Sequence, residues 1–264
     1  MIELWWLGQA GFRLRDPSGG PRVFCDPFLT PREDRTWQAP LDALQLGEQA
    51  DVVLVSHEHI DHFDRPTLRS AAAHGQFTLV LPEPLVDEAL ALGLPRDRVI
   101  GARPDNVLDL NEVRIHPIPA RHGVDVQDAY TFGQELSNGR VRYLGYVVDL
   151  GGVRVYHAGD CIPYERQAER LRTLQPDVVC LPINGRDFYR ETEHNVVGNM
   201  NFREAARLAS DVGARVLVPM HWELFAHNRG FPGDLLAYTS ERFPELSVLV
   251  MGRGARITLS TPAA

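Results

Sequence analysis

A dense cluster of histidines and acidic residues constrains this chain more than any other feature, and it reads Ser56-His57-Glu58-His59-Ile60-Asp61-His62. The cluster directly follows residues 51–55, a valine-rich run that we predict to be a β-strand, so it should lie in the loop at the end of that strand. Imidazoles that are crowded together repel one another once protonated, so packing in a hydrophobic core does not explain the cluster. A cation removes this repulsion because it takes the neutral nitrogens as ligands. The segment therefore predicts a metal site.

The charged residues exclude several kinds of function. The chain of 264 residues has a net charge of -8, whereas a protein that binds the phosphate backbone of a nucleic acid needs a basic stripe. All 27 basic residues are arginines, which excludes Schiff-base chemistry, lysine general bases and a phosphate-binding loop that depends on lysine. Arginine remains well suited to binding a planar or bidentate anion. We therefore expect no nucleic-acid partner.

The cysteines and the apolar runs indicate the compartment. Cys25, Cys161 and Cys180 form no CxxC pair, and we expect them to be small buried side chains in a reducing environment. The first residues lack the basic and apolar regions of a signal peptide, and no apolar run approaches the ~20 residues of a membrane span. We therefore predict a cytoplasmic protein with no membrane partner.

Short apolar runs bounded by turn-forming residues recur along the chain and predict β-strands. They cover residues 51–56, 77–81, 113–118, 143–148, 153–156, 178–181 and 215–219. Two helices are predicted as well, over residues 202–212, which Asn201 can cap, and over residues 163–174, which begin with a proline. Strands and helices in this order predict sheets with helices packed outside them, and we expect one domain over residues 1–264.

The histidine cluster and three later segments together resemble the metallo-β-lactamase fold superfamily. The pattern His57-x-His59-x-Asp61-His62 resembles the superfamily signature. The superfamily also needs a later histidine, a bridging aspartate and a final histidine, and each has a match directly after a predicted strand: His122, Asp160 and His221. The resemblance covers nearly the whole chain. It implies an α/β (α+β) fold, a four-layer αββα sandwich with two mixed β-sheets face to face, helices outside and the metal site at one edge.

The resemblance also implies a ligand set for two divalent metal ions. His57, His59 and His122 should hold one ion, while Asp61, His62 and His221 should hold the other, with Asp160 between them. Two such ions share a hydroxide that attacks the substrate, and Asp61 is placed to handle the proton that passes to the leaving group. His157, just before Gly159-Asp160, is expected to support the site through a hydrogen bond.

Segments of the second half of the chain, and one near its start, resemble one family within this superfamily, the L-ascorbate-6-phosphate lactonases. The matching segments are Leu181-Pro-Ile-Asn-Gly-Arg-Asp187, Gly198-Asn-Met200, Pro219-Met-His-Trp-Glu-Leu-Phe225, Trp6-Leu-Gly-Gln-Ala-Gly-Phe12 and Gly159-Asp-Cys-Ile-Pro-Tyr164. This resemblance implies hydrolytic ring opening of a phosphorylated sugar lactone, with manganese, although the donor set also suits zinc or iron. Arg186 is then expected to bind the phosphate, and Asn184 a sugar hydroxyl. The family's enzymes extend beyond both ends of this chain, so the substrate pocket is expected to differ.

Several alternatives remain open at this point. The same metal site serves phosphodiesterases of the nuclease type and hydrolases of thioesters or other esters. The acidic balance of the chain argues against a nuclease. His194 and His227 lie in loops near the matched segments and are weaker candidates for substrate contact. The sequence is compatible with a homo-oligomer, and the expected partner is a small anionic molecule such as a sugar phosphate.

Overall fold

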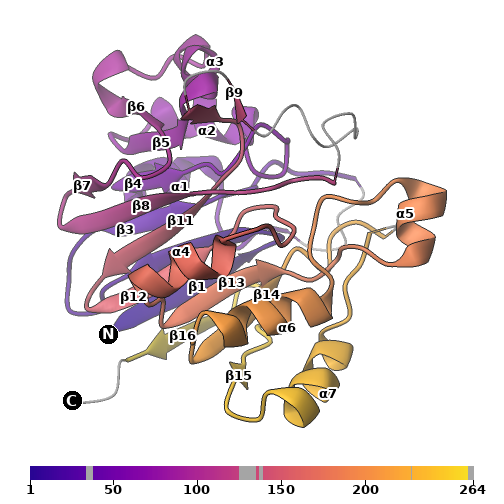
Figure 1. Cartoon of the computed structure of the whole chain (residues 1–264). Helices are drawn as coiled ribbons and strands as arrows, with labels where there is room; N and C mark the ends of the chain where they lie inside the picture. The colour runs from indigo at the N-terminus through magenta and orange to yellow at the C-terminus, as the bar shows by residue number, and fades with distance from the viewer. Residues whose placement is uncertain (34–37, 125–134, 137–138, 227, 261–264) are drawn as a thin grey trace.

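Two mixed β-sheets lie face to face in the computed structural model, which describes residues 1–33, 38–124, 135–136, 139–226 and 228–260 (Figure 1). The first sheet has the order β16-β1-β2-β3-β4-β5-β6. Its pairs are antiparallel from β16 to β3 and parallel from β3 to β6. The strands are β1 (Ile2–Gly8), β2 (Gly11–Arg15), β3 (Arg22–Cys25), β4 (Val52–Leu54), β5 (Thr78–Pro82), β6 (Val99–Ala102) and β16 (Arg256–Leu259).

The second sheet has the order β15-β14-β13-β12-β11-β8-β7. Its pairs are parallel from β15 to β12 and antiparallel from β12 to β7. The strands are β7 (Leu108–Leu110), β8 (Val113–Pro119), β11 (Leu144–Leu150), β12 (Val153–His157), β13 (Val178–Pro182), β14 (Val216–Met220) and β15 (Ser247–Val248). A separate two-stranded ribbon is formed by β9 (Glu135–Leu136) and β10 (Arg140–Val141).

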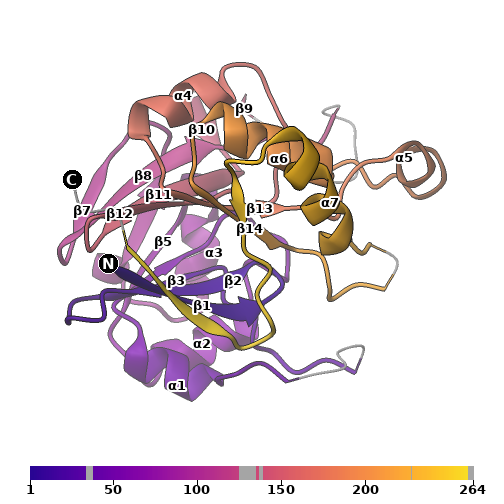
Figure 2. The same ribbon diagram turned by 90° about the horizontal axis from the view of Figure 1, so that it is seen from below.

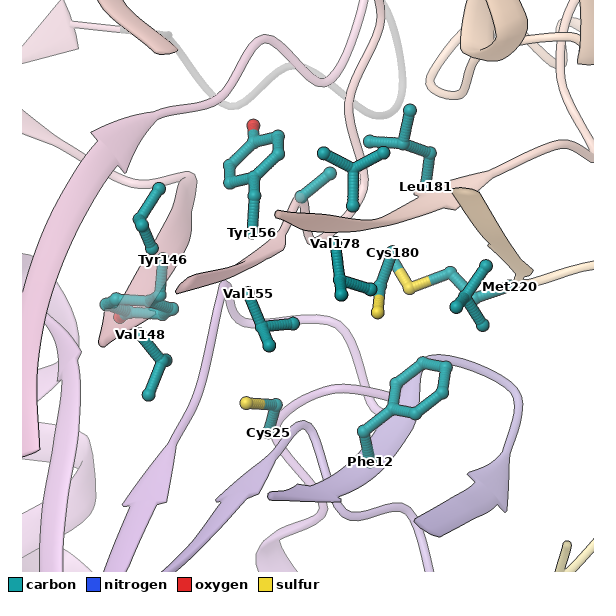
Figure 3. Close-up of a cluster of buried hydrophobic side chains, with 14 of the residues drawn as sticks. Phe12, Cys25, Tyr146, Val148, Val155, Tyr156, Val178, Cys180, Leu181 and Met220 are labelled. Atoms are coloured by element: carbon teal, nitrogen blue, oxygen red, sulfur yellow. The ribbon is translucent and has the colours of Figure 1, made fainter. Parts of the chain in front are cut away.

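The main hydrophobic core fills the space between the sheets, because alternate side chains of each strand point to opposite faces. In β1, Leu4 and Trp6 belong to this core, whereas Trp5 and Leu7 belong to a second cluster on the outer face of the first sheet. Figure 3 shows Phe12 and Cys25 of the first sheet facing Val155 and Cys180 of the second. All three cysteines are free and buried, as predicted.

Helices cover the outer face of each sheet, which completes the four layers (Figure 2). On the first sheet these are α1 (Ala43–Gln49), α2 (Arg65–Ala72) and α3 (Val86–Ala91), with the 3₁₀ turns η1 (Glu83–Leu85) and η2 (Arg96–Arg98). On the second sheet they are α4 (Gln167–Leu174), α6 (Phe202–Asp211) and α7 (Pro232–Arg242), while α5 (Phe188–His194) projects beyond the sheet (Figure 1). The predicted αββα sandwich is confirmed. Among the described residues no helix is both long and apolar enough to cross a membrane.

The structure confirms one of the two predicted helices and corrects the start of the other. The helix over residues 202–212 is confirmed as α6, and its Asn201 and Glu204 form the expected reciprocal cap. The helix over residues 163–174 is wrong in its first turn, because α4 begins only at Gln167 and Arg166 before it has a φ of 66°. The preceding residues are held elsewhere: Ile162 forms a bridge with Arg121. Every predicted strand overlaps a strand of the structure.

Candidate metal centre

The predicted ligands follow strands whose carboxyl ends meet at one edge of the sandwich. Residues 57–62 follow β4 in the first sheet, and His122, Asp160 and His221 follow β8, β12 and β14 in the second. The strands β8 and β12 run in the same direction because both are antiparallel to β11, and β14 is parallel to β12 through β13. The fold therefore brings together ligands that are far apart in the sequence.

A tight turn shapes the histidine cluster itself. The amides of His62 and Phe63 both donate to the carbonyl of His59, at 3.0 and 2.7 Å. Phe63 is fully buried in the cluster between the first sheet and its helices, and the side chain of Asp64 caps α2 directly afterwards. Glu58 points away from the ligands and pairs with Arg142 at 2.9 Å. The turn therefore separates the ligating side chains from the one acidic residue of the motif that does not ligate.

The first ligand cluster contains His57, His59, His122 and Asp160. Nδ1 of His59 lies 3.0 Å from Nε2 of His57 and 3.1 Å from Nε2 of His122. Oδ2 of Asp160 lies 3.5 Å from Nε2 of His122 and 4.0 Å from Nε2 of His57. Donors held tetrahedrally at about 2.1 Å from one ion are about 3.4 Å apart, so these spacings suit a shared cation.

The second cluster contains Asp61, His62 and His221. Oδ2 of Asp61 lies 3.1 Å from Nε2 of His221 and 3.6 Å from Nε2 of His62. Both of these imidazole nitrogens also lie 3.3 Å from Oδ1 of Asp160. One carboxylate oxygen of Asp160 thus faces each cluster, so Asp160 would offer a ligand to each of two ions.

The site carries buried polar atoms that a cation would satisfy. Nε2 of His62 and Oδ1 of Asp160 are buried and make no hydrogen bond in the described part of the chain. Leaving a buried polar atom without a partner costs about 1–3 kcal/mol, and a carboxylate oxygen more. The donor set of five imidazoles and two carboxylates fits divalent ions such as zinc or manganese. The residues present therefore fit two metal ions.

Residues that the sequence did not predict fix the orientation of these imidazoles. Asp26, directly after β3, accepts a hydrogen bond from Nδ1 of His62 at 2.7 Å and another from the hydroxyl of Ser56 at 2.6 Å. Because that hydroxyl proton goes to Asp26, Ser56 can only accept from Nδ1 of His57, at 2.9 Å. Nδ1 of His122 donates to the carbonyl of Gly198 at 2.8 Å. All three contacts leave the Nε2 lone pairs facing the clusters.

Gly198 has to be a glycine for this contact. A Cβ built on it would lie 2.4 Å from Cε1 of His122, so any other residue would push the imidazole away. For Asp26 a signal was present, because it directly follows the apolar run Val23-Phe24-Cys25, although no strand was predicted there. Gly198 and Ser56 carry no comparable signal, since their roles arise only when the loops meet.

The electrostatics of the two clusters differ. Burial lowers the pKa of His57 well below its usual value and the pKa of His122 to about 4. Burial also opposes the charged form of His62 and His221, but the carboxylates of Asp160 and Asp61 outweigh it and raise the pKa of both imidazoles. The first cluster therefore offers imidazoles that are already neutral, whereas the second must lose protons before it can bind a cation.

This difference predicts the order in which acid removes the ions. Protons compete with the second ion as soon as the pH falls through the raised pKa of His62 and His221, but with the first ion only near the lowered pKa of His122, about 4. We expect dialysis against buffers of decreasing pH to release one ion well before the other, measured by elemental analysis. Release of both ions in a single step would contradict this assignment. The variants His57→Ala and His221→Ala should keep only the second and only the first ion respectively, so it would also be contradicted if His57→Ala held its ion to a lower pH than His221→Ala.

The residues predicted to contact the substrate lie in other surroundings. The guanidinium of Arg186 pairs with Glu204 at 2.5 Å and lies 3.9 Å from Glu191. Asn184 is fully buried, and its amide atoms make no hydrogen bond among the described residues. Neither side chain joins the metal clusters. His194 is the last residue of α5, and His227 lies outside the described residues.

His157 supports the site through hydrogen bonds to backbone groups and is not itself a metal ligand. Its Nε2 donates to the carbonyl of Ala10 at 2.7 Å, and its Nδ1 accepts from the amide of Gly159 at 3.2 Å. Gly159 has a φ of 60°, which turns the chain so that Asp160 enters the site. His157 therefore holds the turn that presents the bridging aspartate.

A cavity of about 160 Å³ lies over the two clusters. It exposes one face of the ligands between two loops of the second half of the chain. Its described lining consists of His59, Asp61, His122, Asp160, Val196, Gly198, Asn199, His221, Phe225 and Asn228. The ligands thus meet a small, mostly uncharged chamber.

Comparison with known proteins agrees with this arrangement. The chain is 29% identical over 258 residues to a protein of Rubrobacter xylanophilus named UPF0173 metal-dependent hydrolase, with 97% of this chain and 96% of the relative covered. It is 22% identical over 266 residues to a probable L-ascorbate-6-phosphate lactonase of Salmonella heidelberg, with 89% and 73% covered. The crystal structure of a possible metal-dependent hydrolase from Veillonella parvula has the same fold, with a TM-score of 0.77, 17% identity and 98% and 100% covered.

The family model described as the beta-lactamase superfamily domain matches residues 21–222. This range includes all seven predicted ligands and the strands that carry them. The predicted superfamily is thereby confirmed, whereas the narrower resemblance to the lactonases rests on the more distant relative. The chain therefore belongs to the beta-lactamase superfamily domain family.

Proposed function

We propose that the chain is a metal-dependent hydrolase with two divalent ions, and that its substrate is a lactone. The observation that carries the proposal is the position of Asp160, with one carboxylate oxygen toward each ligand cluster. Relatives named metal-dependent hydrolase and lactonase support the reaction class and the substrate class respectively. When bound, two ions supply a hydroxide nucleophile at neutral pH and polarise a carbonyl oxygen.

The residues of the chain then position the substrate and move the proton. Asp61 lines the cavity, and although burial opposes its ionised form, His62 and His221 lower the pKa of its carboxyl. It is thus an ionised carboxylate beside the reacting groups. We assign to it the transfer of a proton to the alkoxide that leaves when a lactone ring opens, and its lowered pKa means that it holds this proton only in passing. Val196 and Phe225 add apolar side chains to the wall of the cavity.

The cavity over the two clusters suits a small substrate. Its volume is about 160 Å³. A small ring can enter, with Val196 and Phe225 as apolar walls and the amides of Asn199 and Asn228 near its hydroxyls. A phosphodiesterase acting on nucleic acid is the second candidate, and the net charge of -8 argues against it.

A hydrolysis panel tests this proposal. The metal-loaded protein is assayed against sugar lactones, simple thioesters and phosphodiesters under identical conditions. We expect the highest kcat/KM for a lactone, and we expect activity to disappear after chelation and to return with added ions. A preference for phosphodiesters or thioesters would support a metal-dependent hydrolase but would contradict the proposal that its substrate is a lactone.

Arg186 is the residue proposed to bind a phosphate group of the substrate. Its guanidinium is mostly buried and pairs with Glu204 at the start of α6, so a phosphate would have to replace this carboxylate. If it does, Arg186→Ala removes a charge-assisted hydrogen bond worth about 1.5–3 kcal/mol. We expect KM for a phosphorylated lactone to rise roughly ten- to a hundredfold, with no change for the unphosphorylated lactone.

Glu204→Gln is the matched control, because it frees the same arginine. A phosphate site predicts that this variant binds the phosphorylated lactone at least as well as the wild type. Equal losses in both variants, for both substrates, would assign the pair of Arg186 and Glu204 to holding α6 and would remove the phosphate from the proposal.

A further inference from the structure

Gln9 reaches the metal centre from a part of the chain that precedes the segment matched by the family model. It lies in the turn between β1 and β2 with a φ of 52°, and its carbonyl accepts hydrogen bonds from the amide of His221 and the indole of Trp6. Its own amide donates to Glu223 at 3.0 Å. The backbone of Gln9 is therefore tied to the loop that carries His221.

The side chain of Gln9 is inserted between two ligands of the second cluster. It is only 2% exposed, and its terminal Nε2 lies 2.9 Å from Oδ2 of Asp61 and 2.8 Å from Nε2 of His221. Oε1 is buried without a hydrogen-bond partner in the described part of the chain. A half-turn about the last side-chain bond exchanges the two terminal atoms of a carboxamide with almost no change of shape.

A cation in the second cluster favours one of these two orientations. The ion takes the Nε2 lone pair of His221, so the carboxamide can no longer donate to that nitrogen, and an N–H dipole directed at a cation is repelled. An oxygen in the same place is attracted to the cation. In the structure Nε2 occupies this place. Its distances to Asp61 and His221, 2.9 and 2.8 Å, approach those of Asp61 from His221 and from His62, 3.1 and 3.6 Å.

We propose that Gln9 is a further ligand of the second ion, through its carboxamide oxygen. This inference rests on the two-ion site of the proposed function. It makes the sites chemically unequal: the first has three imidazoles and one carboxylate oxygen, while the second has two imidazoles and three oxygens, from Asp61, Asp160 and Gln9. Oxygen ligands suit manganese and imidazoles suit zinc, so the second site prefers manganese relative to the first.

The test measures Mn²⁺ binding to metal-free protein by calorimetric titration, without substrate, for the wild type, Gln9→Leu and Gln9→Glu. Gln9→Leu keeps the bulk but removes the oxygen, and we expect affinity at one of two sites to fall at least roughly tenfold. Gln9→Glu places a carboxylate oxygen at the same point, and we expect it to keep or increase that affinity. Gln49→Leu, on the distant helix α1, is the control for removing a glutamine.

The outcomes separate the alternatives. Unchanged affinity in Gln9→Leu, or equal losses in Gln9→Leu and Gln9→Glu, would overturn the inference, because equal losses mean that the residue acts by donating an N–H to Asp61. Thermal unfolding of the metal-free variants shows whether each is folded, and Gln9→Glu alone still decides between ligand and donor. A wild type that binds only one ion contradicts the two-ion site itself, whereas a lack of lactone hydrolysis leaves this inference intact.

Discussion

Replacing Asp160 with alanine is expected to lower kcat/KM by at least about a thousandfold, which corresponds to about 4 kcal/mol of transition-state stabilisation. The reason is the double contact of its carboxylate, because Oδ1 faces His62 and His221 while Oδ2 faces His57 and His122. Losing it removes one ligand from each ion and leaves buried imidazoles facing each other. The measurement is steady-state hydrolysis of the best substrate from the panel, with metal content determined on the same sample.

Asp105→Ala is the matched control, because Asp105 is exposed on the surface and pairs only with Arg170 among the contacts described for it. We expect it to retain wild-type activity. An Asp160→Ala protein that is folded, binds two ions and keeps more than about a tenth of the wild-type kcat/KM would show that the carboxylate does not join the two clusters.

The second large effect is expected for Asp61→Asn. The asparagine keeps an oxygen near His221 but cannot accept a proton at neutral pH, and general acid–base catalysis contributes typically ~10²–10⁴ in rate. We expect kcat to fall by about this factor with little change in KM, because the group acts in the transition state. Turnover and metal content are measured together on the purified variant.

Metal content decides how such a loss is interpreted. A variant that keeps both ions and loses turnover supports the role of Asp61 in proton transfer. If turnover falls only in proportion to the loss of bound metal, Asp61 acts as a ligand and not in proton transfer. Unchanged turnover at full metal content would contradict its assigned role altogether.

The parts of the site that could be predicted are those fixed by local sequence. Four of the seven ligands lie within residues 57–62, where one turn after one strand places them. The apolar run before them predicts the strand and a loop after it, but not the turn itself. His122, Asp160 and His221 were identified from the resemblance to the metallo-β-lactamase fold superfamily, and each also follows a predicted strand.

The parts that could not be predicted depend on contacts between distant loops. The hydrogen bonds of Asp26 and Ser56 to the imidazoles form only because β3 and β4 are neighbours in the sheet. Arg186 looked free to bind an anion, but α6 places Glu204 against it. The first turn of the predicted helix over residues 163–174 is absent because the preceding loop pairs with Arg121. Each depends on packing that short-range propensity does not contain.

The central claim is that one carboxylate joins two metal-binding clusters, and counting the ions per chain tests it most directly. Elemental analysis of the metal-replete wild type should give close to two ions per chain. His221→Ala, which removes a ligand of the second cluster only, should give close to one. At most one ion in the wild type under metal-replete conditions would contradict the two-ion site and the mechanism built on it.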